Sequence, residues 1–212
     1  MPLIDGSGSV AEELPALLGH LNAVCATLDG DARDRAHALA ADAHHVAASL
    51  MLKHGDLGLA ALAADRSMRA AIASGNPVAI ASSARIITHA LMNSGHHATA
   101  VATATSYASG LGRDLPDPTP GSLSVYGALL LRRAIAAAER KAALLIDTAR
   151  AFLQRARHEN AYLALRAAHQ TAPEEVAGRA SVRDLVRELA ATAPPTIKRD
   201  ANQFAASIGA AQ

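Results

Sequence analysis

The chain has 212 residues, of which half are apolar but only 2% are aromatic, and it contains no Trp. A core made mainly of Ala, Leu, Val and Ile favours closely spaced helices over a sheet, so the composition predicts an all-α protein. The formal net charge of +1 gives no general reason to expect a nucleic acid, an acidic partner or a membrane surface.

The first half of the chain shows helical periodicity from residue 10 to residue 112, after a Gly/Ser-rich lead over residues 1–9 that is predicted to be mobile. The first helix is predicted over 10–28 and the second over about 31–53, with Leu39 and Val46 facing the core. A third helix, in which Leu59 and Leu62 are expected to pack, ends before the Gly75–Pro77 turn. A further helical hairpin follows and completes a set of N-terminal helical repeats.

Three turns share one pattern. Gly55 and Gly95 occupy equivalent turns, and each is followed five residues later by an alanine, Ala60 or Ala100. A third turn places Ala161 five residues after Ala156. The recurrence predicts repeated helical hairpins in which small residues allow close packing.

The second half begins with a Pro-rich segment, residues 113–122, which is interpreted as a linker. C-terminal helical repeats are expected over 123–192, and a tail or cap helix over 193–212. Near residues 138–141 a first repeat helix runs directly into the next first helix. Two explanations remain open: one helix of about thirty residues, or a missing segment, which we favour because half a hairpin leaves an apolar face uncovered.

The hairpin over residues 142–175 shows the repeat most completely. Two short amphipathic helices flank the turn at 155–158, and small residues of one helix face larger apolar residues of the other. This arrangement resembles the tetratricopeptide repeat, whose pattern positions are occupied here by Leu145, Thr148, Ala149, Phe152, Ala161, Leu165, Ala168 and Pro173. The resemblance implies antiparallel helical hairpins stacked as a right-handed solenoid.

A wider resemblance covers most of residues 14–192. The segments HHVAASLMLKHGDLGLAALAADRSMRAA, ASSARIITHALMNSGHHATAVATA, SLSVYGALLLRRAIAAA and APEEVAGRASVRDLVRELAA are similar to the tetratricopeptide-like sensor region of bacterial XRE-type helix-turn-helix transcriptional regulators. The resemblance implies a ligand-sensing, self-associating domain. Residues 10–28 lack a basic recognition helix, so direct nucleic-acid binding by this chain is not expected.

The candidate binding surface is the inner face of the first helices of each hairpin. Matching this face across the repeats selects polar, mostly cationic side chains at His45, Ser49, Lys53, Arg85, His89, Asn93, Arg132, Arg150 and Gln154. One interpretation is an ordinary solvated face. The other is a groove for a peptide or an anionic small molecule, in which arginines clamp carboxylates and Asn93 pairs with peptide amides. In that case, replacing Arg85 and Arg150 by Ala abolishes binding.

Catalytic and metal sites are not predicted. The His44–His45 and His96–His97 pairs have poor geometry for one ion, and no cysteine completes a tetrahedral set with His37 and His44. Cys25 lies on an apolar helical stripe, which indicates an inert thiol. No phosphate-binding loop is present, so no cofactor and no enzyme activity are expected.

The expected cellular setting follows from Cys25 and from hydropathy. One cysteine excludes an internal disulfide framework and fits a reducing compartment. The start of the chain lacks a signal-peptide pattern, and no apolar stretch approaches the about 18 residues of a membrane span. We therefore predict a cytoplasmic, non-catalytic sensor domain that forms a homodimer and binds no membrane. The alternative is a protein–protein interaction scaffold with no small ligand.

Overall fold

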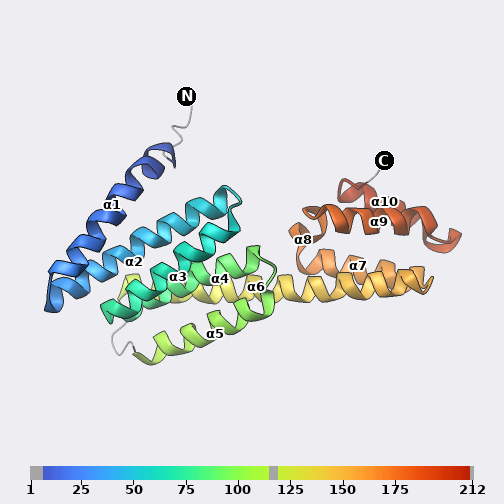
Figure 1. The fold of residues 1–212 in the computed structure, drawn as a ribbon. Helices are drawn as coiled ribbons and strands as arrows, with labels where there is room; N and C mark the ends of the chain where they lie inside the picture. Colours follow the sequence, from blue (N-terminus) through green and yellow to red (C-terminus); the bar gives the residue numbers. More distant parts are fainter. Residues whose placement is uncertain (1–6, 115–118, 211–212) are drawn as a thin grey trace. The chain divides into compact units, whose positions relative to one another are not determined.

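The computed structural model describes residues 7–114 and 119–210, and within them it contains helices and no strand (Figure 1). The all-α prediction is confirmed for these residues. The ten helices that they form are α1 (Ser7–Thr27), α2 (Gly30–Lys53), α3 (Leu57–Ser74), α4 (Pro77–Asn93), α5 (His97–Asp114), α6 (Pro120–Gln154), α7 (His158–Thr171), α8 (Pro173–Ala177), α9 (Ala180–Thr192) and α10 (Pro195–Ser207).

The chain divides into two compact units, residues 1–136 and 137–212, and the division falls inside α6. Parts of the predicted lead (1–6) and of the predicted linker (115–118) lie outside the described residues. Helix α6 is continuous through 138–141, as the first of the two explanations for that junction predicts. The missing segment stays a prediction, because a deletion that preserves helical periodicity also leaves one continuous helix.

In the unit of residues 1–136, each of the helices α1 to α4 packs against the next, and α2 also packs against α4. Buried hydroxyl groups join three of these helices. Ser67 Oγ on α3 donates to the carbonyl of Ala41 on α2 at 2.8 Å. Because its own hydrogen is used in this bond, Ser67 Oγ accepts from Ser83 Oγ on α4, also at 2.8 Å. Because each buried hydroxyl has a partner, small polar residues can occupy a close helix contact at little cost.

The unit of residues 137–212 has one continuous apolar core, formed by the second half of α6 with α7 to α10. Leu165 on α7, Val176 on α8, and Val186 and Leu189 on α9 are fully buried in it. Phe204 on α10 is also buried and attaches the last helix to this core. Across the described ranges 7–114 and 119–210, none of the helices has the length and apolar character needed to cross a membrane.

The three predicted turns have the same backbone conformation. Gly55, Gly95 and Ala156 all adopt positive φ angles, of 76°, 79° and 55°. In each turn the N–H of this residue donates to the carbonyl three residues back, and the next N–H donates to the carbonyl five residues back. This is the Schellman pattern that closes a helix C-terminus. Ala60, Ala100 and Ala161, five residues later, are completely buried.

Ala156 is the one described non-glycine residue with positive φ, so we expect Ala156→Gly to stabilise the protein. Removing Cβ relieves the strain of the left-handed conformation, and this effect raises the free energy of unfolding by about 1 kcal/mol. Glycine also increases the entropy of the unfolded chain, which offsets part of that gain. Chemical denaturation measures the change. The matched control is Gly95→Ala, which introduces the same strain and should lower stability; a destabilised Ala156→Gly protein would contradict the assignment.

Four large side chains that were expected to pack are exposed instead. Leu39 and Leu59 are 59% and 51% exposed, and Val46 and Leu62 are also exposed, so their predicted core positions were wrong. Alanines take these positions in the interface: on α2, the buried stripe runs through Ala36, Ala40, Ala43 and Ala48. Helices that meet through alanine approach too closely to admit Leu on the same face.

Candidate functional site

Four of the predicted site residues come together in the unit of residues 1–136: His45 on α2, Arg85 and His89 on α4, and Arg132 on α6. We call them the cationic cluster. Arg85 Nη2 lies 2.8 Å from His45 Nε2. His45 and Arg85 are 40 residues apart, the same separation as between Gly55 and Gly95, so they occupy equivalent positions in successive hairpins. Repetition therefore explains why these two residues face one another.

The His45–Arg85 contact fixes the protonation of the histidine. A guanidinium has no acceptor, so Arg85 donates and the Nε2 atom of a neutral His45 accepts. The pKa of His45 is lowered to about 4, chiefly by burial and in part by the charges of Arg85 and His89. A hydrogen bond to the Ser82 backbone opposes the shift by favouring the charged ring. At neutral pH, His45 is thus an uncharged acceptor that orients Arg85.

His89 continues the cluster toward α6. It follows Arg85 by one helical turn, so the two share a face of α4. Burial lowers the pKa of His89, and the charges of Arg132 and then Arg85 lower it further. The neighbouring histidines are therefore neutral at pH 7, and the two guanidinium groups carry the charge of the cluster. In the part of the chain that the structure describes, no carboxylate forms an ion pair with Arg85.

Ser49, Lys53 and Asn93 lie farther along the same two helices, and all three are exposed. Ser49 Oγ donates to the carbonyl of His45 at 3.0 Å, and Asn93 Nδ2 donates to the carbonyl of His89 at 3.0 Å. Each side chain thus bonds to its own helix backbone, a local arrangement common for short polar residues. A bound peptide could compete with these weak local bonds, so the predicted role of Asn93 stays open as a prediction.

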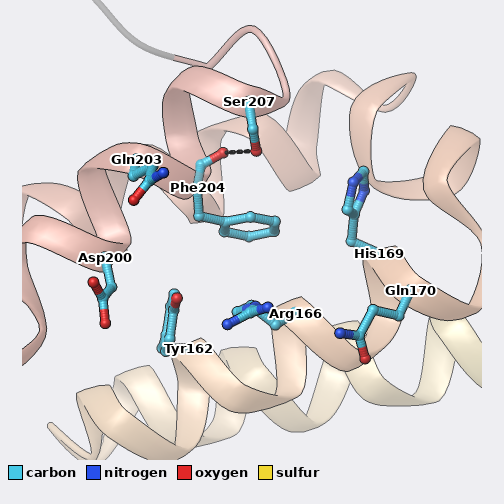
Figure 2. A pocket seen from close by; sticks show the side chains of 8 residues that line it. All are labelled: Tyr162, Arg166, His169, Gln170, Asp200, Gln203, Phe204 and Ser207. Atoms are coloured by element: carbon cyan, nitrogen blue, oxygen red, sulfur yellow. Dashed lines mark hydrogen bonds between the residues drawn. The ribbon is translucent and has the colours of Figure 1, made fainter.

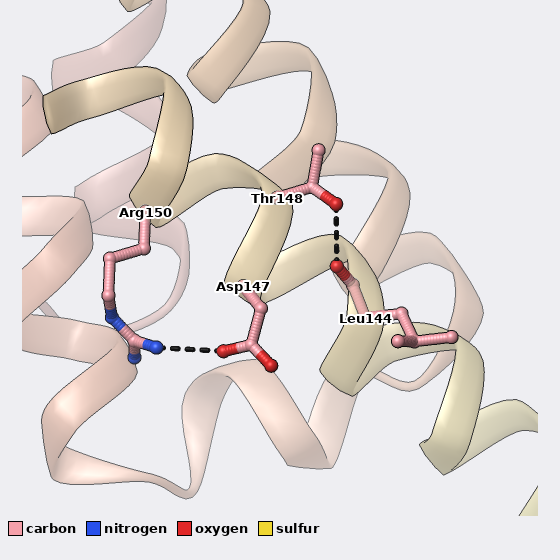
Figure 3. Close-up of polar contacts among 4 residues, drawn as sticks. All are labelled: Leu144, Asp147, Thr148 and Arg150. Atoms are coloured by element: carbon pink, nitrogen blue, oxygen red, sulfur yellow. Dashed lines mark hydrogen bonds and ion pairs between the residues drawn. The ribbon is translucent and has the colours of Figure 1, made fainter. Parts of the chain in front are cut away.

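Arg150 and Gln154 belong to the other unit, residues 137–212. Arg150 Nη1 lies 2.7 Å from Asp147 Oδ1, one turn earlier on α6 (Figure 3). Both side chains are largely exposed, and such a pair contributes little to stability. Thr148 in the same turn donates to the carbonyl of Leu144, again within its own helix. The roles predicted for Arg150 and Gln154 remain predictions.

His37 and His44, which share a face of α2, both line a hollow of about 440 Å³ that also includes Cys25 and Arg66. Burial, followed by the charge of Arg66, lowers the pKa of His44. No group of three or more His, Cys, Asp or Glu side chains that could hold a metal ion occurs in residues 7–114 and 119–210.

Sequence reasoning selected the residues of the cationic cluster but did not predict the direct His45–Arg85 bond or the part played by Ser82. The shared separation of 40 residues was the available signal for the first. The contact with Ser82 depends on how each helix is rotated about its axis, which no sequence pattern records.

Comparison with protein-family models, with curated proteins and with solved structures gave no match to this chain.

Proposed function

We propose that this chain is a non-catalytic, tetratricopeptide-like domain of a transcriptional regulator that senses a ligand and self-associates. The observation that carries the proposal is the His45–Arg85 contact, which joins equivalent positions of successive hairpins into one cationic cluster. In this proposal the hairpins stack as a right-handed solenoid, and the chain works in the cytoplasm, where the thiol of Cys25 stays reduced.

The repeat geometry supports this architecture. Gly55, Gly95 and Ala156 close three turns with the same hydrogen bonds, and a buried alanine follows each turn at the same distance. In the unit of residues 1–136, α2 contacts both its hairpin partner α3 and the next first helix, α4. First helices that touch one another line a common face, which is where a stacked-hairpin protein binds its ligand.

The chemistry of the cluster favours an anionic ligand, either a small carboxylate or phosphate or an acidic peptide. Two half-buried guanidinium groups next to neutral imidazoles form a positive, partly desolvated surface. Arginine presents paired N–H donors that match a carboxylate or phosphate. Binding would displace α4 relative to α2 and so change the stacking of the hairpins, and with it the surface offered to a second copy.

The proposal predicts that Arg85→Ala weakens binding of an anionic ligand at least about tenfold, because it removes both a donor and the partner of His45. The probes are small dicarboxylates, organic phosphates and acidic peptides, each titrated into the full chain while the ring resonances of His45 and His89 are followed by NMR. Arg69→Ala is the matched control, since Arg69 is an exposed arginine of the same unit paired with Asp65 at 2.8 Å.

We expect saturable shifts of both histidine rings in the wild type and in Arg69→Ala, and a large loss of affinity in Arg85→Ala. If no probe moves these resonances, or if Arg85→Ala binds as well as the wild type, the cluster is an ordinary solvated face and the sensor proposal fails.

A protein-interaction scaffold without a small ligand is the second candidate. The observation that favours it is a set of large apolar side chains at the surface, with Leu131 and Leu163 each 63% exposed and Ile72 59% exposed. A protein partner or a second copy could cover such side chains. Capture of a defined protein by a chain whose cationic cluster stays empty would favour the scaffold.

A further inference from the structure

A groove in the unit of residues 137–212 lies between α7 and α10 and has a volume of about 370 Å³ (Figure 2). This volume is within the range of about 300–1,000 Å³ that is typical of small-molecule sites. It is lined by Tyr162, Arg166, His169, Gln170, Asp200, Gln203, Phe204 and Ser207. None of these residues belongs to the cationic cluster.

The groove has an aromatic wall, although the whole chain contains only two Phe, three Tyr and no Trp. The ring of Phe204 meets that of Tyr162 edge-on, at 6.3 Å and 83°, and that of His169 at 5.7 Å and 69°. Rings held edge-to-face from two helices form a rigid surface. Tyr162 and Phe204 are 9% and 7% exposed, so a small part of each ring is left for an apolar group of a ligand to contact.

The two helices bring opposite charges to the same groove. Arg166 on α7 lies over the ring of Tyr162, 5.8 Å from its centre, and Asp200 projects from α10 (Figure 2). Within residues 7–114 and 119–210, neither side chain forms an ion pair with any other. Both side chains are exposed. A groove that offers one cation and one anion, neither held in an ion pair, suits a ligand that carries both charges, whereas Asp200 would repel a simple anion.

A further polar atom of the groove also lacks a partner. His169 Nδ1 is buried and has no hydrogen-bond partner among the described residues. A buried polar atom without a partner costs free energy, and a ligand recovers it only if the His169 ring turns Nδ1 toward the groove. Gln170 and Gln203 add amide groups at the same groove (Figure 2).

We propose that this groove binds a free α-amino acid. Arg166 takes the carboxylate and Asp200 takes the ammonium group, and the side chain lies on the aromatic wall of Phe204 within reach of His169. The inference goes beyond the ligand proposed for the cationic cluster, because the two sites share no residue and belong to different units of the chain.

The test is a calorimetric titration of the full chain with each of the common L-amino acids, and with the same compounds blocked as N-acetyl amides. We expect at least one free amino acid to bind with a Kd on the order of 1 mM or tighter. Its blocked form should not bind, because blocking removes both charges. Arg166→Gln and Asp200→Asn should each weaken binding by at least about tenfold.

Arg199→Gln and Asp184→Asn are the matched controls, because both residues are exposed and neither lines the groove. Both control variants should bind the amino acid with wild-type affinity. Arg85→Ala should do so too, because Arg85 belongs to the cationic cluster and does not line the groove. Circular dichroism verifies that the groove variants fold. The proposal is overturned if no free amino acid binds, if the blocked forms bind equally well, or if Arg166→Gln and Asp200→Asn retain wild-type affinity.

Discussion

Replacing Ala161 by Leu is expected to lower the free energy of unfolding by about 1–3 kcal/mol. Ala161 is completely buried, and so are Ala149 on α6 and Leu165 one turn farther along α7 in the same core. The added atoms of Leu have no space unless α7 moves away from α6 or a neighbour leaves its preferred rotamer. Hydrogen exchange of the α7 amides measures the loss in this unit alone.

Ala151→Leu is the matched control, because Ala151 is an exposed alanine of α6 in the same unit. The substitution is chemically identical, and we expect a change of less than about 0.5 kcal/mol. Similar effects at the two positions would show that the alanine contacts do not set the spacing of these helices, and the hairpin account of the fold would be wrong.

Acidification is expected to destabilise the unit of residues 1–136 through His45. The folded pKa of about 4 lies below the ordinary value of 6.5, so the unfolded chain binds a proton in this interval that the folded chain excludes. Stability from the neutral ring is therefore fully present above about pH 6.5 and is lost as the pH falls to about 4. Allowing for the part of the ring that faces solvent, we expect a loss of about 1–2 kcal/mol from His45.

His44 and His89 act in the same direction, because burial lowers the pKa of each. The measurement is the free energy of unfolding as a function of pH. His45→Gln should show a shallower pH dependence, since a Gln oxygen can accept from Arg85 but does not titrate. If stability does not fall between pH 6.5 and pH 4, the neutral His45–Arg85 contact is contradicted.

The sequence predicted local features well where a short pattern determines them. The glycine at positions 55 and 95 fixes a left-handed turn, and an alanine five residues later is small enough to pack at the next helix contact. Such rules depend on a few neighbouring residues. They were therefore visible without any knowledge of the packing around them.

The side of each helix that becomes buried was harder to predict, because several helices carry apolar residues on more than one face. On α2, Leu39 and Val46 are more hydrophobic than Ala40 and Ala43, yet the alanines are buried and the larger residues are exposed. Burial here follows the close approach of α2 to α3 and α4, which is a property of the assembled unit. A hydrophobic pattern alone assigns the larger side chains to the core.

The two candidate sites differ in how far the sequence alone indicates them. The His45–Arg85 pair could be anticipated, because it repeats the separation of the turns. The groove between α7 and α10 was not anticipated, because it depends on where Phe204 attaches the last helix to the core. Neither Arg166 nor Asp200 belongs to a recognisable motif, and only the packed structure brings them to one groove.

The most direct test of the sensor proposal is native mass spectrometry of the chain purified gently from its own host, alongside an Arg85→Ala chain prepared identically. We expect the wild type to retain a small anionic molecule or a short acidic peptide, released on denaturation, and the Arg85→Ala chain to have lost it. A wild-type chain of bare protein mass, or the same bound mass in both chains, would contradict ligand sensing by the cationic cluster.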